Sequence, residues 1–453
     1  MKNQQKALLF EEIPIPKAVA TLAVPTVLSS LVMVLYNLAD TYFVGMCNDP
    51  IQNAAVTLAA PVLLAFNAVN NLFGVGSSSM MSRALGRKDY DTVYKSSAFG
   101  FYCALLSGIL FSVICWIFYQ PLLHLLGADI HTASATGAYL KWTAIFGAAP
   151  SILNVVLAYM VRSEGSALHA SIGTMSGCLL NIILDPVFIL PWGLNLGAAG
   201  AGLATFLSNC GALLYFVLFL YKKRGDTYVC IRPDKFTLER NIVRGVCNVG
   251  IPASIQNLLN VTGMTILNNV TSSFGADAVA AMGITQKINQ VPMQIAMGLS
   301  QGIMPLVSYN YSSKNHKRMK ETLSFTVKIS QGFLCTVALL YFVFAGPLTR
   351  MFMDNEIIVG YGIKFLRGFC LGMPFLCMDF LAVGVFQAVG MGRYALVFAI
   401  MRKVVLEIPA LYILNYVFPL YGLAYAQLTA EVVLAVVAVV VLARLFKKLD
   451  REN

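Results

Sequence analysis

Two aspartates lie inside long apolar stretches of this sequence. Asp40 ends an uncharged run that begins at Ala18, and Asp185 lies in a later apolar run. A carboxylate at membrane depth costs about 2.5–3.5 kcal/mol on insertion scales, so each acid needs a partner or a bound ion. Tyr36 and Asn181 each precede one of these acids by about one helical turn and share its face. Two carboxyl groups with such neighbours can share one proton or bind Na⁺ through their oxygens.

An alternative position for both acids is the aqueous boundary, where a carboxylate costs little. Pro186 directly follows Asp185 and offers an end to its span, but Val187–Leu190 continue the apolar run. Pro25 lies in the middle of the first apolar stretch, where it removes a backbone hydrogen bond and favours a kink. A kinked first span that carries an acid indicates a moving part.

A second set of charges lies in the apolar stretches of the C-terminal half. Its members are Lys287, Asp379, Arg402, Lys403, Glu407 and Glu431. Charged residues in membrane spans usually face the interior and pair with one another. We therefore predict a secondary charged cluster built from Lys287, Asp379, Arg402 and Glu407. Two interpretations of it stay open, a mutually neutralising structural group or a role with substrate or coupling ion.

The composition indicates what must position these residues. Of 453 residues, 58% are hydrophobic and 12% charged, with a mean hydropathy of +0.72, whereas soluble proteins carry roughly 25% charged residues. The chain is therefore predicted to be an all-α polytopic membrane protein. The ten cysteines and four histidines are dispersed and form no metal or disulfide motif. Segments long enough to cross a ~30 Å hydrocarbon core predict twelve spans near 18–44, 54–75, 94–118, 139–161, 167–191, 197–221, 247–271, 280–307, 322–345, 361–389, 394–415 and 419–443.

Basic residues set the expected orientation. Most of the 32 lysines and arginines fall before the first span, in alternate loops, and after the last span. This asymmetry predicts that both termini are cytoplasmic. It also accounts for the net charge of +11 without a nucleic-acid partner. We expect a multi-pass protein of the cell membrane, surrounded by lipid.

The segment 222–244 is the one long charged connection, and it divides the chain into two similar halves. Gly76–Lys88 aligns without a gap with Gly302–Lys314, and the Pro25 region resembles that of Pro252. The prediction is an N-terminal six-helix lobe (1–221), a cytoplasmic linker (222–244) and a C-terminal six-helix lobe (245–453). Because six spans per half insert the same way up, the axis relating the halves runs along the membrane normal. Substrate is then expected in a central cavity between two pseudo-symmetric bundles.

These features together resemble the MATE (multidrug and toxic compound extrusion) transporters, closest to the DinF-like and MepA-like branches. The residues that carry the resemblance are Pro25, Asp40, the stretch FGVGSSSMMSRALGRKDYD at Phe73–Asp91, and NIILDP at Asn181–Pro186. The resemblance implies export of organic, cationic or amphipathic compounds driven by inward H⁺ or Na⁺. It places cation coupling at Tyr36, Asp40, Asn181, Asp185 and Thr205, of which Asp40, Asn181, Asp185 and Thr205 also suit Na⁺. A NorM-like site needs an acid in span 7, which is absent, although Asp379 matches its span 10 position.

The sequence disfavours three other functions. A lipid-linked precursor flippase of the same superfamily typically has fourteen spans and a strongly cationic cavity, which this sequence does not predict. An intramembrane enzyme needs a catalytic constellation such as HExxH, and none occurs. A channel is disfavoured because no filter motif repeats. We expect a monomeric, non-enzymatic transporter without an organic cofactor, and the sequence does not name its substrate.

Overall fold

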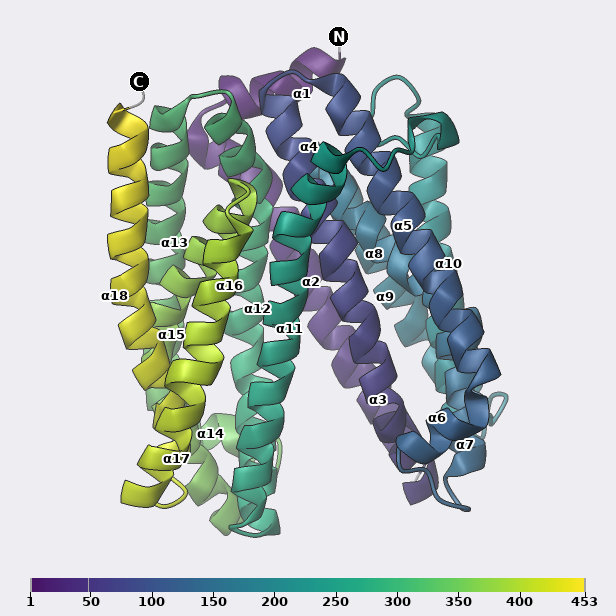
Figure 1. The fold of residues 1–453 in the computed structure, drawn as a ribbon. Coiled ribbons are helices and arrows are strands. Elements are labelled where there is room, and N and C mark those ends of the chain that lie inside the picture. Colours follow the sequence, from purple (N-terminus) through teal and green to yellow (C-terminus); the bar gives the residue numbers. More distant parts are fainter. Residues whose placement is uncertain (1, 48, 452–453) are drawn as a thin grey trace. The chain divides into compact units, whose positions relative to one another are not determined.

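The computed structural model describes residues 2–47 and 49–451, and all regular structure within these ranges is helical (Figure 1). The chain divides into two units. The first unit comprises the residues up to Glu12 together with Leu28–Ser254, and the second comprises Ile13–Val27 together with the residues from Ile255 onward. Two long helices, α2 (Ile15–Gly45) and α11 (Arg240–Ser272), therefore each contribute to both units.

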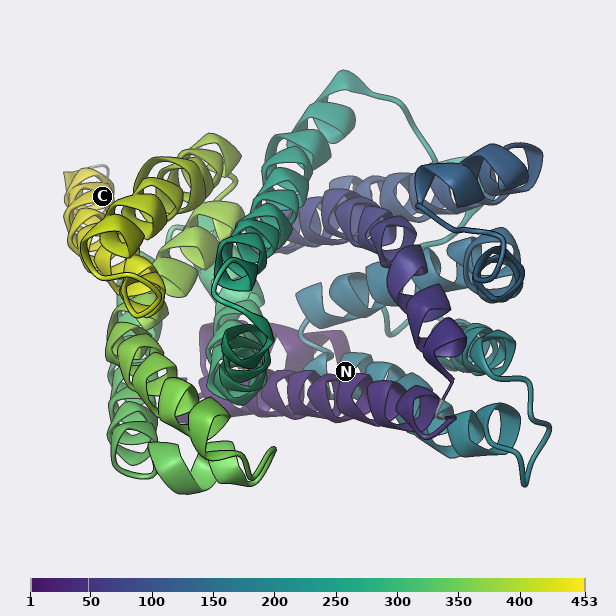
Figure 2. The ribbon, with the colours of Figure 1, turned by 90° about the horizontal axis from the view of Figure 1, so that it is seen from below.

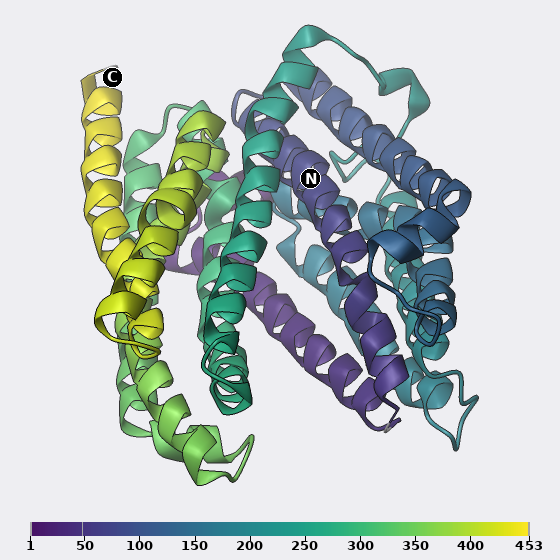
Figure 3. The same ribbon diagram turned by 60° about the horizontal axis from the view of Figure 1, so that its bottom comes forward.

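The first unit is built around α8 (Ala148–Ser163), which packs against helices of four other spans. Its remaining elements are α1 (Lys2–Glu11), α3 (Pro50–Asn70), η1 (Asn71–Val75), α4 (Gly76–Gly86), α5 (Tyr90–Ile117), α6 (Tyr119–Leu125), α7 (Ala133–Leu140), η2 (Lys141–Phe146), α9 (Ala167–Ile189), α10 (Ala198–Lys222) and η3 (Pro233–Lys235). Helix α1 and the α10–α11 connection lie at one end of this unit, and α6 and α7 lie at the other (Figure 1). The connection crosses the outside of the unit next to α5 (Figures 2 and 3).

The second unit is organised around α15 (Glu356–Ala388), whose apolar window is 78% buried. It contacts α12 (Ala276–Ser312), α13 (His316–Val343) and α18 (Gly422–Arg451). The unit is completed by α14 (Ala345–Arg350), α16 (Gly392–Ile400), η4 (Met401–Glu407) and α17 (Ile408–Val417). A helix enclosed on most sides can carry charged residues only where its neighbours supply partners.

Eight helical segments in the described ranges are long and apolar enough to cross a membrane, and the bent pair of α7–η2 with α8 makes a ninth. Three further long segments complete the twelve that the sequence predicts, namely α11, α12 and the run α16–η4–α17. These three miss the apolar criterion because they carry amides or charges, among them Lys287, Arg402 and Glu407. The chain is thus a multi-pass membrane protein whose least apolar spans are concentrated in its C-terminal half.

The second span is longer than predicted, since it continues through η1 and α4 to Gly86 rather than ending near residue 75. Its last turns, GSSSMMSRALG, look like a loop by hydropathy, yet almost all of these residues are buried. A Cβ on Gly76 would lie 2.5 Å from the carbonyl oxygen of Val246. Small residues therefore make this stretch helical by allowing close helix packing.

The two helices that belong to both units change unit shortly after a proline. Pro25 lies inside α2, which passes from one unit to the other between Val27 and Leu28. Pro252 lies inside α11, which does so between Ser254 and Ile255. An interior proline leaves one backbone hydrogen bond unmade, so each helix is weakened near this passage.

Candidate functional site

The first unit brings the sequence-predicted acids together. Asp40 comes from α2 and Asp185 from α9, and Asp185 has no exposed surface. Their carboxyl groups are within hydrogen-bonding range of one another. A hydrogen bond between two carboxyl groups needs a proton on one of them. The pair is therefore built to hold one proton, or a cation in its place.

Asn181 and Thr205 complete the polar side of this pair. Asn181 is 2% exposed and lies one turn before Asp185 on α9. With its amide oriented to satisfy both ends, Asn181 donates a hydrogen bond to Asp185 Oδ2 at 2.7 Å and accepts one from the backbone N–H of Thr205 at 3.2 Å. The Oγ1 of Thr205 lies 3.3 Å from the Asn181 side chain. Amide, hydroxyl and carboxyl oxygens thus converge from α9 and α10.

Two tyrosines lie within electrostatic reach of both carboxyl groups, Tyr36 on α2 and Tyr139 on α7. Tyr36 is among the residues predicted from the sequence, whereas Tyr139, which is only 4% exposed, is not. A signal for it was present, because Tyr139 opens the predicted fourth span at the end where the first and fifth spans carry their acids. A comparison of the expected membrane depths of polar residues on different spans would have added Tyr139 to the predicted site.

No basic side chain pairs with Asp40 or Asp185 in the part of the chain that the structure describes. One oxygen of Asp40, Oδ1, is buried and has no hydrogen-bond donor among the described residues. Buried acids normally have a cationic or hydrogen-bonding partner. This pair therefore has unused capacity for a positive charge.

The second unit holds a charged cluster of a different kind. Arg402 of η4 lies 3.2 Å from Asp379 Oδ2 on α15 and 2.6 Å from Glu431 Oε1 on α18. All three side chains are at most 6% exposed. Beside them Lys403 and Glu407 form an ion pair at 2.7 Å. Each of these acids therefore has a basic partner supplied by the protein itself.

Lys287, which was predicted from the sequence to belong to this cluster, is exposed on α12, so this part of the prediction is wrong. The ion pairs of the cluster among the described residues do not include it. Spacing alone could not exclude it, because exposed and buried residues alternate along α12 around Lys287. Glu431 was predicted to be a buried charge but was not included in the cluster, and in the structure it is the second acid that contacts Arg402.

Pro25 lies in the part of α2 that belongs to the second unit. Close to it, a Cβ on Gly302 of α12 would lie 2.6 Å from Cα of Ala23. The glycine therefore lets the first half of α2 pack directly on α12. The proline sits between this tightly packed half and the half that carries Asp40.

The MatE family model matches residues 25–187 and 252–413 of the chain. The two matched stretches correspond to the two similar halves, and each begins at one of the prolines near which a helix changes unit. The chain belongs to the MatE family, and the resemblance found in the sequence is confirmed.

Relatives match over nearly the whole length. The multidrug export protein MepA of Staphylococcus saprophyticus is 32% identical over 446 residues, which cover 97% of this chain and 96% of the relative. A solved structure described as the outward-facing conformation of a multidrug resistance MATE family transporter has a TM-score of 0.92 at 26% identity and covers 98% of both chains. A structure described as MATE in the bent conformation has a TM-score of 0.90 at 26% identity, with 99% of this chain and 98% of that chain covered. The family and these relatives are described as transporters rather than enzymes.

Proposed function

We propose that this protein exports organic, cationic or amphipathic compounds across the cell membrane by antiport with H⁺ or Na⁺. One observation carries the proposal: Asp40 and Asp185 form a buried acid pair without a basic partner among the described residues. The names of the relatives, which include multidrug export proteins, support the substrate class. The coupling ion acts as a second transported substrate, and the protein works as a monomer without an organic cofactor.

The charge distribution predicts at which depth of the membrane the acid pair lies. Basic residues concentrate in alternate loops and at both ends of the chain, which favours cytoplasmic termini. In that orientation the acid pair lies in the outer half of the membrane, where an ion enters from outside. One charge that crosses 100 mV supplies about 2.3 kcal/mol, and a concentration gradient adds to it.

In the proposed cycle, the ion binds first and substrate leaves second. The outward-open pump takes up H⁺ or Na⁺ at Asp40 and Asp185, with Asn181 and Thr205 as neighbouring oxygen ligands. The bound positive charge lowers the cost of enclosing the two carboxyl groups, so α2 can bend at Pro25. This bend displaces substrate outward, and on the inside new substrate replaces the ion.

The test is transport in proteoliposomes with a hydrophobic fluorescent cation as substrate. A proton gradient and a Na⁺ gradient are imposed separately, and we expect one of them to drive transport. Asp40→Asn and Asp185→Asn should each abolish gradient-driven transport while the protein still folds.

Asp129→Asn is the matched control. Asp129 lies in the α6–α7 loop, outside the spans, and hydrogen bonds from Thr132 hold its pKa below the usual value. The control should transport at the wild-type rate. Wild-type rates in Asp40→Asn would remove the acid pair from the mechanism, and transport of lipid pyrophosphates instead of organic cations would favour a flippase.

A further inference from the structure

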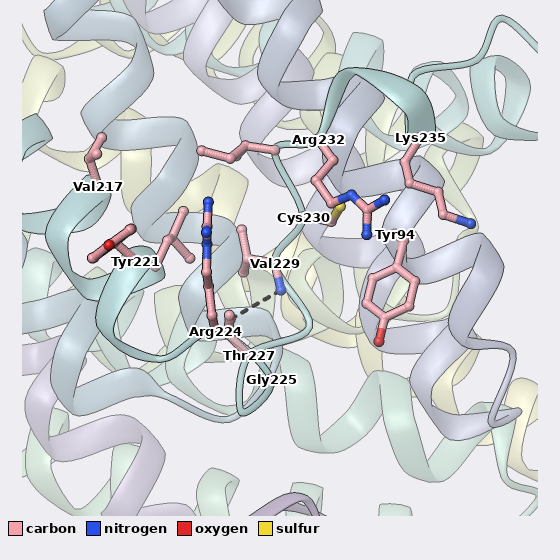
Figure 4. Close-up of a pocket in the computed structure, with 12 residues that line it drawn as sticks. Tyr94, Val217, Tyr221, Arg224, Gly225, Thr227, Val229, Cys230, Arg232 and Lys235 are labelled. Carbon is pink, nitrogen blue, oxygen red and sulfur yellow. Dashed lines mark hydrogen bonds between the residues drawn. The ribbon is translucent and has the colours of Figure 1, made fainter.

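A cavity of about 750 Å³ lies where α10 ends and the connection to α11 folds back over α5 (Figure 4). The ends of two candidate spans, α10 and α5, border it. Ends of spans lie at the depth of lipid headgroups. The cavity belongs entirely to the first unit and is separate from the acid pair, and the proposed transport cycle does not use it.

The lining of this cavity combines cationic and apolar groups. Arg224, Arg232 and Lys235 contribute positive charge, and none of the lining residues described is acidic. Arg232 pairs with Asp234 at 2.8 Å and Lys235 with Asp91 at 2.9 Å, both from outside the lining.

Arg224 differs from the other two cations, since no carboxylate pairs with it among the described residues. Its guanidinium lies 5.0 Å from the ring centroid of Tyr221. Figure 4 shows Arg224 between Tyr221 and Val229. The cavity therefore presents one uncompensated cation, held by an aromatic ring, with two further cations nearby.

The wall of the cavity is fixed before any ligand arrives. The backbone N–H of Cys230 donates to Ser97 at 2.9 Å, and Tyr102 donates to the carbonyl of Ile231 at 2.8 Å. Glu164, with no exposed surface, accepts hydrogen bonds from the N–H of Tyr228 at 2.6 Å and from Lys6 Nζ at 2.8 Å. A loop held in this way loses little entropy when it binds a ligand.

An exposed apolar stripe leads along α10 to the cavity. Leu214, Val217, Leu218 and Tyr221 follow one another at helical spacing and are 40–65% exposed. In a membrane this face of a candidate span contacts acyl chains. A soluble anion would use only the cations, whereas a lipid would use both the cations and the stripe.

We propose that this cavity binds an anionic phospholipid, with the headgroup phosphate on Arg224 and Arg232 and an acyl chain along the stripe on α10. Basic pockets at the ends of transmembrane helices suit such headgroups. The bound lipid would join the end of α10 to the connection that leads into α11.

The experiment uses the full-length protein in detergent and short-chain phosphatidylglycerol as probe, with phosphatidylcholine and inorganic phosphate as separate arms. Binding is measured by native mass spectrometry and by the shift in thermal unfolding. Wild type should bind phosphatidylglycerol in preference to the other two. Arg224→Gln combined with Arg232→Gln should weaken this binding by about fivefold for each charge removed.

Arg244→Gln is the matched control, because Arg244 is exposed and lies outside the cavity lining. It should bind phosphatidylglycerol as wild type does. Arg224→Lys retains the charge and should keep most of the phosphatidylglycerol binding of wild type. This variant keeps the proposal testable if the double variant folds poorly. Equal phosphatidylglycerol binding by wild type and a folded double variant would overturn the proposal, and so would inorganic phosphate that binds and stabilises as well as the lipid.

Discussion

The two units each bury a group of carboxylates, but they balance the charge in opposite ways. In the second unit, Asp379 and Glu431 share Arg402, at 3.2 and 2.6 Å. In the first, Asp40 and Asp185 have only each other and uncharged neighbours in the described residues. The acids of the second unit contact an arginine and so already have a cationic partner, whereas the acid pair of the first unit has none and leaves room for a mobile cation. We therefore propose that ion coupling belongs to the first unit and that the cluster of the second unit is structural.

The largest expected effect comes from Arg402→Met. Removing one partner of a buried ion pair costs about 3–5 kcal/mol, because the remaining charges stay buried without compensation. Thermal unfolding of the purified protein should show a large loss of stability. Adding Asp379→Asn and Glu431→Gln should recover much of it. If Arg402→Met were as stable as wild type, the structural assignment of this cluster would be wrong.

A third buried acid of the first unit, Glu164, differs from the acid pair because it has a basic partner. It pairs with Lys6 at 2.8 Å and also accepts from Thr227 and Tyr228. Hydrogen bonds to charged groups contribute about 1.5–3 kcal/mol. Glu164→Gln should therefore lower the free energy of local opening of the α10–α11 connection by about that amount. Hydrogen exchange at residues 226–231 measures this change.

The matched control for Glu164 is Glu239→Gln in the same connection. Glu239 forms an exposed pair with Lys95, and exposed pairs contribute about 0–1 kcal/mol. Exchange should therefore change little in this variant. Equal effects of the two substitutions would contradict the role given to Glu164.

Asn181→Ala should produce a smaller effect, confined to ion binding. It removes the hydrogen bond to Asp185 Oδ2 at 2.7 Å but leaves both carboxyl groups in place. A net hydrogen-bond contribution of about 1 kcal/mol corresponds to about a fivefold weaker apparent affinity for the coupling ion. Transport measured against ion concentration should show this shift with a similar maximal rate. An unchanged affinity would exclude Asn181 from the ion site.

The smallest difference is expected between the two equivalent prolines. Pro25→Ala restores a helical hydrogen bond in α2 and should slow transport several-fold by resisting the bend. Pro252→Ala makes the same change in α11, which carries no acid, and should slow it less. Initial transport rates at saturating substrate compare the two. A larger effect at Pro252 would move the hinge to the other half of the chain.

Much of the fold could be predicted from the sequence, because long apolar runs between basic loops leave few alternatives. The exceptions have local causes. The helix at Gly76–Gly86 was missed because its small polar residues are buried by close packing, which hydropathy does not detect. The segments richest in amides and charges, such as α12, were nevertheless correctly predicted as helices.

The candidate site could be predicted only in part. Helical spacing paired Tyr36 with Asp40 and Asn181 with Asp185, since partners on one helix are fixed by its period. Lys403 and Glu407 have the same spacing of four residues and form an ion pair. Contacts between different helices depend on how the helices pack, which helical spacing does not predict. The position of Glu431 beside Arg402 and the exposure of Lys287 therefore could not be predicted from the sequence.

Ion release on substrate binding tests the central claim most directly. Purified protein loaded with the coupling ion is titrated with a hydrophobic cation, and released H⁺ and ²²Na⁺ are both recorded. Wild type and Asp129→Asn should release one of these ions as substrate binds, while Asp40→Asn and Asp185→Asn should bind substrate without releasing either. Undiminished ion release from both acid-pair variants would contradict the account and place coupling elsewhere in the protein.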